Sequence, residues 1–336
     1  MNYLILFLVP IIIFLINFYL KKKKILSNFS GDNHQKFLGA KNIPLSGGIF
    51  LFLFLIPIVK ITPNLYFFLF FIFIVGLFSD LKIFSSPLKR FFFQSLVILI
   101  FVIATNLKID PTGVIIIDFL LKNIYFSIFF SYFCLIILIN GTNFIDGLNG
   151  LVLVYYLIVN IIVLKLSFQL GFFYNQIFFE YLIFILSTLI IFNFFNQLYL
   201  GDNGSYIIST LIGFLLIKLY NNTEISSFFV ILLLWYPCFE NLFSIVRKFQ
   251  IHKSPLAPDN NHLHQLLYYY LKVKLKKNNL FINNLTSMII NIYNFLILLL
   301  GSEYFSNTQI LLLIILFNVI TYTIIYIRLF KFKFKV

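Results

Sequence analysis

Charged residues are scarce in this sequence. They make up 11% of its 336 residues, whereas hydrophobic residues make up 61%. A soluble globular domain has about 25% charged and 45–50% apolar residues. So little charge argues against a water-soluble fold and in favour of a chain that lies in a membrane.

Cysteine and tryptophan are scarce as well. The two cysteines, Cys134 and Cys238, both lie inside apolar runs, which argues against a disulfide framework. One Trp stands against 47 Phe and 20 Tyr, and we expect the Phe side chains to face lipid or to pack between helices, not to line a cofactor pocket. No internal repeat or low-complexity linker divides the chain, so we expect one integral membrane domain over residues 1–336.

Long apolar runs, by contrast, are abundant. A helix crosses the hydrocarbon core of a bilayer with roughly 17–25 residues, and these runs predict an all-α polytopic fold of about eleven (10–11) transmembrane helices. The first is expected to be kept as a helix, because KKKK follows it, whereas a signal peptide carries its positive charge before its apolar stretch. The expected helices span residues 3–20, 46–61, 64–78, 91–106, 117–139, 151–168, 177–195, 205–220, 226–244, 286–303 and 309–327.

Positive charge outweighs negative charge, with 25 Lys and Arg against 11 Asp and Glu. Basic residues of membrane proteins concentrate in cytoplasmic segments, and most of those here do so if the chain has eleven spans and its N-terminus outside. The excess charge of +14 is then a topology signal and an attraction to anionic lipid. Nucleic-acid binding is not expected, because no basic stripe with interleaved exposed aromatics appears.

Polar residues gather in four islands, which fall on the predicted cytoplasmic side. The first, VGLFSDLKIFSSPLKRFFFQ at residues 75–94, places Asp80 near Lys82, Lys89 and Arg90. Taken alone, this island is explained equally well by a plain salt bridge and by a functional carboxylate.

The second island, NGTNFIDGLNG at residues 140–150, separates two apolar runs. Asn140, Asn143, Asp146 and Asn149 recur every three residues and would share one face of a helical turn. Such side chains are costly at membrane depth unless they line a cavity or reach water. A simple polar turn is the alternative, but it would not require this stripe, so we expect a functional site.

The third island, FNQLYLGDNGSY at residues 195–206, sets Asp202 between two glycines before an apolar helix. The N–H groups at a helix N-terminus suit a phosphate. An adjacent carboxylate suits Mg²⁺, which is often held by one or two carboxylates plus substrate phosphates. Ser205 or Asn203 acting as an N-cap is the alternative, and both explanations can hold together.

The fourth island, residues 247–277, contains His262 and His264. A structural zinc site is not expected, because His-x-His lacks Cys or a matching Glu. With Arg247 and Lys248, the two His suit a diphosphate or nucleotide, and the segment LLYYYLKVKLKK is expected to lie on the membrane surface. A transporter would place its polar residues near the bilayer midplane. These residues lie mostly at helix ends, which favours a metal-bound phosphate site within reach of a lipid head group.

The ordered motifs resemble a known family. IPLSGGI, GLFSDLK, NGTNFIDGLNGL, YLGDNGSY and PDNNHLHQLLY, within residues 40–270, are similar to those of the polyprenyl-phosphate N-acetylhexosamine-1-phosphate transferases (MraY/WecA-like, glycosyltransferase family 4). The resemblance implies a multi-pass enzyme of the bacterial inner (plasma) membrane with its active site on the cytoplasmic face. Such an enzyme moves a sugar-1-phosphate from a UDP-sugar to undecaprenyl phosphate, releases UMP, and starts a lipid-linked surface glycan such as lipopolysaccharide.

The resemblance also implies roles for individual residues. Asp202 would be the ligand of Mg²⁺, or of Mn²⁺ in its place. Asp80 would position or deprotonate the lipid phosphate, and Asp146 would help to hold the metal-diphosphate or the nucleotide. The residues expected to bind substrate are Asn140, Asn143, Asn149, Asn193, Ser205, Arg247, Lys248, His262 and His264.

Three positions depart from the family pattern. Ser79 stands where the first Asp of an Asp-Asp pair is usual, Asn149 stands where many relatives have Asp, and Gln265 replaces a third His. A catalytically degenerate homologue is therefore one alternative, and a lipid or sugar transporter is another. The identity of the sugar, the glycan pathway and a homodimer stay open.

Overall fold

The chain is all-helical in a computed structural model that describes residues 3–27, 43–56, 62–171, 176–250, 252, 254 and 260–335. Within these ranges it has fourteen helices and no strand beyond one isolated bridge. The predicted all-α fold is therefore confirmed. The helices are α1 (Tyr3–Lys23), α2 (Gly47–Phe54), α3 (Pro63–Asp80), α4 (Pro87–Ala104), α5 (Ile115–Leu121), α6 (Ile124–Ile145), α7 (Leu151–Gln169), α8 (Gln176–Phe194), α9 (Gly201–Asn222), α10 (Ser227–Leu233), α11 (Trp235–Gln250), α12 (Leu263–Leu275), α13 (Asn279–Glu303) and α14 (Thr308–Phe334).

Seven of the described helices are long and apolar enough to cross a membrane, or eight if α10 and α11 form one bent span. The seven are α3, α4, α6, α7, α9, α13 and α14. This finding agrees with a polytopic membrane protein. The count of eleven spans and the N-terminus outside stay predictions.

Two of the expected spans are interrupted. The segment expected at 117–139 is divided into α5 and α6, because the Asn123 side chain accepts hydrogen bonds from the N–H groups of Tyr125 and Phe126 and so caps a new helix. The segment expected at 226–244 breaks at Leu234, where α10 and α11 meet at 78°. Residues 57–61 of the expected helix 46–61 lie outside the described ranges.

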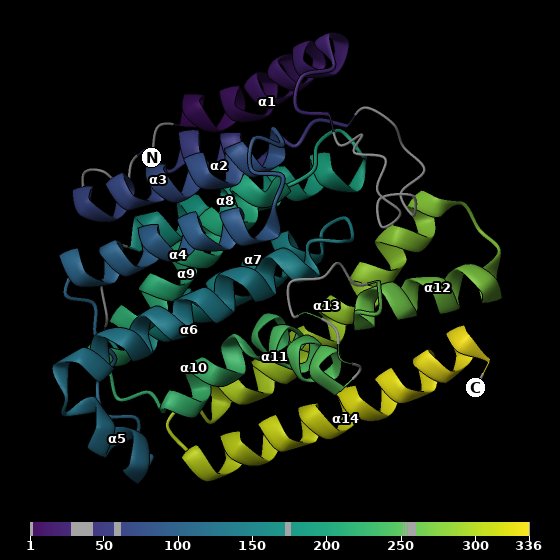
Figure 1. Ribbon diagram of the computed structural model, residues 1–336. Coiled ribbons are helices and arrows are strands. Elements are labelled where there is room, and N and C mark those ends of the chain that lie inside the picture. The colour runs from purple at the N-terminus through teal and green to yellow at the C-terminus, as the bar shows by residue number, and fades with distance from the viewer. Residues whose placement is uncertain are drawn as a thin grey trace.

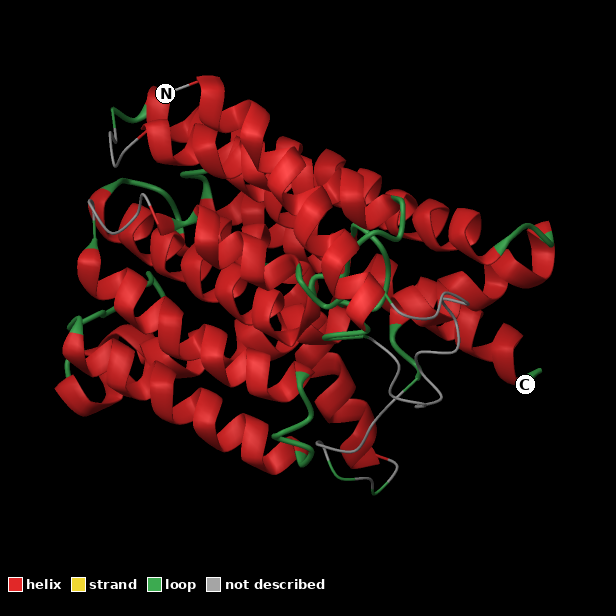
Figure 2. Ribbon diagram, turned by 90° about the horizontal axis from the view of Figure 1, so that it is seen from above, coloured by secondary structure: helices red, strands yellow, loops and turns green. Residues whose placement is uncertain are grey.

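The long helices run side by side as a bundle, with α5 at one end and α12 at the other (Figure 1). Seen from above, the connecting loops gather toward the two ends of the helices (Figure 2). Helix α9 lies at the centre and packs against α2, α3, α6 and α7. Of its most apolar 18-residue window, 89% is buried, although this window is the least hydropathic of the seven. Its small polar residues, such as Ser205 and Ser209, are buried with the apolar ones.

Small residues allow the helices around α9 to approach closely. A Cβ added to Gly76 on α3 would lie 2.4 Å from the Asn203 Cα atom, and one added to Gly48 on α2 would lie 2.3 Å from the Gly204 backbone nitrogen. Close packing of small residues drives helix association in membranes, where hydrocarbon surrounds the helices and the hydrophobic effect between them is weak. These contacts hold the first turn of α9 against α2 and α3.

The polar islands meet at one end of this bundle. Helix α3 ends at Asp80, α6 ends at Ile145 and α9 begins at Gly201. Because α6 begins beside α5, its last turn lies at the end of the bundle opposite α5, the end where α12 lies (Figure 1).

Candidate active site

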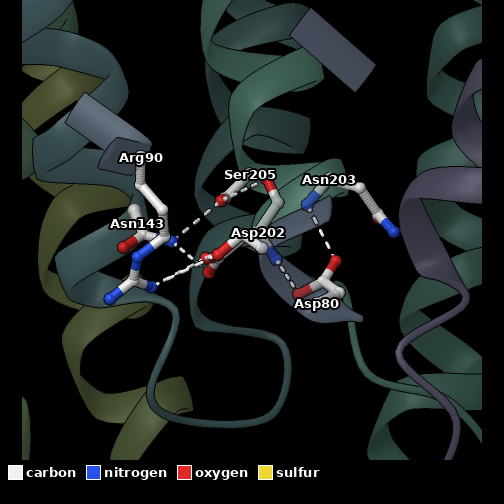
Figure 3. Close-up of polar contacts among 7 residues, drawn as sticks. Asp80, Arg90, Asn143, Asp202, Asn203 and Ser205 are labelled. Carbon is white, nitrogen blue, oxygen red and sulfur yellow. Dashed lines mark hydrogen bonds and ion pairs between the residues drawn. The ribbon is translucent and has the colours of Figure 1, made fainter. Parts of the chain in front are cut away.

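Asp80 closes the N-terminus of α9. Its Oδ1 accepts the N–H of Asp202 at 2.9 Å, and its Oδ2 accepts the N–H of Asn203 at 3.1 Å (Figure 3). The first N–H groups of a helix have no partner within the helix, and the positive end of its dipole favours a carboxylate. The expected alternative, in which Ser205 or Asn203 caps this helix, is wrong, because no side chain of the segment itself forms the cap.

Gly201 makes this contact possible. Its φ is +78°, a conformation that residues with a Cβ rarely adopt, and an added Cβ would lie only 2.8 Å from the Asp80 Oδ2 atom. The glycine before Asp202 is therefore required by both its backbone conformation and the closeness of the carboxylate.

Asp202 is the second carboxylate of the site and the more accessible one. Its Oδ1 accepts a hydrogen bond from Asn143 Nδ2 at 2.6 Å, and its Oδ2 accepts bonds from Arg90 Nη1 at 3.2 Å and from the Ser79 hydroxyl. The side chains of Asp202 and Arg90 are 21% and 33% exposed. Water or a soluble ligand can thus reach this ion pair. Of the cations of the first island, Arg90 thus pairs with Asp202.

Asn143 links the second island to the third. Its Nδ2 also lies 3.3 Å from Ser205 Oγ, which donates to the backbone oxygen of Asp202 at 3.1 Å. Asn143 on α6, Arg90 on α4 and Ser79 on α3 thus hold both oxygens of the Asp202 carboxylate from three different helices, and Figure 3 shows the first two of these contacts.

Asp146 follows α6 directly and is the third carboxylate near this point. Burial raises the pKa of Asp146 to about 8, with a further rise from Asp202 and a smaller opposing effect of the Gly201 N–H. A cation beside Asp146 would offset the repulsion that Asp202 exerts on the ionised Asp146 carboxylate.

The residues fit Mg²⁺ with substrate oxygens as its remaining ligands. In the part of the chain that the structure describes, no three His, Cys, Asp or Glu side chains form a metal site by themselves. Mg²⁺ is commonly bound by one or two carboxylates together with phosphates, and Asp202 and Asp146 supply such carboxylates.

The two histidines lie beside the loop that carries Asp146. His262 is the N-cap of α12, and its ring centroid lies 5.4 Å from that of Phe144 and 5.7 Å from that of His264. His264 is fully buried, and neither of its ring nitrogens has a hydrogen-bond partner among the residues that the structure describes. A Cβ added to Gly147 would lie 2.6 Å from His264 Nε2. Burial, reinforced by His262, lowers the pKa of His264 to about 3, so this ring is neutral at physiological pH.

Of the two basic residues of α11, Lys248 lies over the Phe144 ring and Arg247 contacts the residue before His262. Lys248 Nζ lies 5.5 Å from the centroid of the Phe144 ring. Arg247 Nη1 donates to the Asn261 backbone oxygen and to the Tyr326 hydroxyl, both at 2.6 Å. Arg247 thereby fixes the residue that precedes His262.

Three predicted residues make contacts with the fold instead of with the carboxylates. Asn140 Nδ2 donates to the Ile136 oxygen within α6. Asn193 Oδ1 accepts the Gly150 N–H at 2.5 Å, and the Asn149 backbone N–H donates to the Asn283 side chain at 2.7 Å. Asn149 and Asn193 are buried and hold the turn before α7.

Three residues of this end of the molecule were not predicted as site residues. Arg90 and Ser79 both contact Asp202, and Glu240 on α11 contacts His262 at 2.9 Å. The signal for Glu240 was present as a carboxylate within an apolar run. The signal for Arg90 was its place in the first island, which did not reveal its partner. Pro258 and Asp259 of the last motif lie outside the described residues.

Part of the chain is similar to known proteins. Residues 62–220 match "Glycosyl transferase family 4", and this segment contains all three aspartates. The chain is also similar to the "Probable undecaprenyl-phosphate N-acetylglucosaminyl 1-phosphate transferase" of Bacillus subtilis (strain 168), with 27% identity over 210 residues. That match spans 59% of this chain and little more than half, 56%, of the relative. Residues 62–220, in which Asp80, Asp146 and Asp202 lie at the ends of helices, are thus similar to glycosyl transferase family 4.

Proposed function

We propose that this protein transfers a sugar-1-phosphate from a UDP-N-acetylhexosamine to undecaprenyl phosphate, and so initiates a lipid-linked surface glycan. A phosphate oxygen of the lipid forms a bond to the sugar-proximal phosphorus of the donor. The bond from that phosphorus to the bridging oxygen breaks, and UMP leaves with this oxygen. The observation that carries the proposal is the partly exposed Asp202, held between Arg90 and Asn143 at the N-terminus of the central helix.

Phosphoryl transfer of this kind requires positioning and charge neutralisation more than a strong base. Mg²⁺, or Mn²⁺, bound by Asp202 with help from Asp146 would supply a positive charge on the diphosphate oxygens. Arg90 already lies on the Asp202 carboxylate, and its guanidinium is suited to a bidentate contact with a phosphate. Of the two roles considered for Asp80, its contacts favour positioning, since both of its oxygens accept backbone N–H groups of α9.

The polar ends of the helices also suggest how the two substrates reach the site. His262 and Lys248 lie beside Phe144, and His264 stacks on His262. We propose that His262 and Lys248 bind the diphosphate or the nucleotide, and that His264, which is fully buried and neutral, supports the His262 ring. The proposed membrane is the bacterial plasma membrane, with this end of the bundle on the cytoplasmic side, where UDP-sugars occur. The lipid phosphate would enter from the surrounding bilayer.

The test is UMP release by the purified protein in detergent or lipid. The reaction contains undecaprenyl phosphate, Mg²⁺ and one UDP-N-acetyl sugar from a small panel. We expect release with one sugar, its loss on adding EDTA and its return with added Mg²⁺. A transporter would instead move substrate across a vesicle membrane without releasing UMP, and a degenerate homologue would release none.

Ser79 is the position that separates an active enzyme from a degenerate one. In the structure its hydroxyl donates to the Asp202 carboxylate, so it has a defined contact within the site. We expect the wild-type protein to be active with this serine. If folded wild-type protein releases no UMP while Ser79→Asp does, the degenerate homologue is the correct alternative.

A further inference from the structure

Glu240 is a buried carboxylate to which the proposed reaction assigns no role. It lies on α11 and is the only acidic side chain with no exposed surface among the described residues. A carboxylate is costly to bury unless hydrogen bonds compensate it. Its partners therefore indicate why it is there.

Three donors surround the Glu240 carboxylate. Oε1 lies 2.9 Å from His262 Nδ1 and accepts the Leu263 N–H at 3.2 Å. Oε2 accepts the Tyr322 hydroxyl at 2.7 Å. The contacts join α11, the start of α12 and α14 at one point.

This arrangement determines the protonation of the His262 ring. A carboxylate that accepts from Leu263 and Tyr322 can only accept from the imidazole as well, so Nδ1 must carry a proton. In the neutral ring Nε2 is then the nitrogen with a free lone pair, and it is the one left for a ligand. The ring is also stacked at 14° to that of His264, so its plane is held as well as its tautomer.

The surroundings place this ring at the candidate active site. Its centroid is 5.4 Å from that of Phe144, which lies in the last turn of α6, two residues before Asp146. Arg247 and Lys333 bind the segment just before His262, through the Asn261 oxygens. The histidine is thus held by several contacts from its own and neighbouring helices.

We propose that Glu240 is a positioning residue, which holds His262 with its proton on Nδ1 so that Nε2 binds the diphosphate of the nucleotide sugar. The inference rests on the proposed function for the identity of that ligand. The competing explanation is a purely structural brace, in which Glu240 only joins three helices.

The tautomer can be tested without any activity. The experiment is a ¹⁵N NMR spectrum of the full chain labelled at its four histidines, with His262→Ala used to assign the signal. We expect a protonated Nδ1 and, at neutral charge, an unprotonated Nε2 in His262. A ring with its proton on Nε2 and none on Nδ1 would overturn the inference.

The role in binding is tested with a double-variant cycle, using UMP with Mg²⁺ as the probe in calorimetry. Glu240→Ala and His262→Ala should each raise the Kd by about ten-fold or more, since each removes a hydrogen bond to a charged group. If Glu240 acts through His262, the double variant binds no more weakly than His262→Ala alone. If instead the two fold-changes in Kd multiply in the double variant, Glu240 acts independently of His262, as a structural brace, and the inference is refuted.

Two further variants keep the cycle decisive. Where Glu240→Ala does not melt cooperatively, Glu240→Gln takes its place in the same cycle. Tyr322→Phe is the matched control: it removes the donor to the other carboxylate oxygen, and it should lower the melting temperature while leaving the Kd within about two-fold. Equal effects of Tyr322→Phe and Glu240→Ala on the Kd would also favour the brace. A wild-type protein that binds no UMP refutes the proposed function and the binding role together, and the NMR spectrum still decides the tautomer.

Discussion

Replacing Gly201 by Ala tests how the site is built, because one methyl group would disturb both the backbone and the Asp80 carboxylate. The alanine must adopt a φ of +78°, which costs roughly 1–2 kcal/mol. Its Cβ would lie 2.8 Å from Asp80 Oδ2, whereas ordinary contact begins at 3.4 Å. The carboxylate must therefore move by the difference of 0.6 Å, and its hydrogen bonds to Asp202 and Asn203 lengthen.

Gly113→Ala is a matched control for this substitution. Gly113 has a φ of +80°, and an added Cβ there would meet nothing within 4 Å. Both variants therefore carry the same backbone strain, and only Gly201→Ala displaces Asp80. Since a hydrogen bond to a charged group contributes about 1.5–3 kcal/mol, Gly201→Ala should be destabilised by about 3–5 kcal/mol and Gly113→Ala by about 1–2 kcal/mol.

The assay is thermal unfolding in detergent, together with UMP release. We expect the melting temperature of Gly201→Ala to lie at least about 3 °C below that of Gly113→Ala, on the scale of 2–4 °C for each kcal/mol. The rate should fall about a hundred-fold only in Gly201→Ala, because the Asp202 backbone is displaced. Equal melting temperatures and equal rates in the two variants would refute the role that we assign to Asp80 and Gly201.

Other predictions concern the carboxylate, the helix crossing and the buried histidine. Asp202→Asn should lower UMP release at least about a hundred-fold with little change in melting temperature; unchanged turnover would exclude Asp202 as the metal ligand. Gly76→Ala, whose Cβ would lie 2.4 Å from the Asn203 Cα atom, should cost about 1–3 kcal/mol or more from overpacking, and an unaltered melting temperature would show that α3 can shift freely. The pKa of His264, lowered to about 3 by burial, lies below the value of about 6.5 in an unfolded chain, so the unfolded state binds an extra proton between these values. The free energy of unfolding should therefore fall as the pH drops from 7 toward 4. His264→Gln should weaken the dependence of the melting temperature on pH over this range. An unchanged dependence would contradict the lowered pKa of His264.

Hydropathy and motif order predicted much of this protein. The scarcity of charge and the apolar runs indicated an all-helical membrane protein, because the cost of burying charge in hydrocarbon is a property of each segment by itself. The polar islands likewise indicated Asp80, Asp146, Asn143 and Asp202, since such residues at the ends of apolar helices call for a functional explanation.

Local sequence was a poorer guide to where helices break. The division at Asn123 depends on a single capping side chain, and the 78° bend at Leu234 occurs within an apolar run that contains no glycine there. A hydropathy average over the length of a span resolves neither feature. The local signals are single residues: Lys122 and Asn123 precede α6, and Pro237, which has no N–H to donate, lies in the first turn of α11.

Only the tertiary structure shows which residues of the site contact one another. Asp80 contacts a residue 122 positions away, and Ser79 contacts the same Asp202 from 123 positions away. Asn149, which matched the periodic stripe of the second island, turned out to hold a turn against α13. A spacing of three residues shows which side chains share a face, but it does not show which helix lies opposite.

The sequence by itself determined that this chain is helical, apolar and polar mostly at its helix ends, because those properties are sums over neighbouring residues. Only the tertiary structure decided that Asp80 of α3 caps α9, that Arg90 of α4 pairs with Asp202, and that Glu240 of α11 holds His262. The physical reason is that hydrogen bonds and ion pairs act over a few ångströms in space, and distance in space is set by how helices cross.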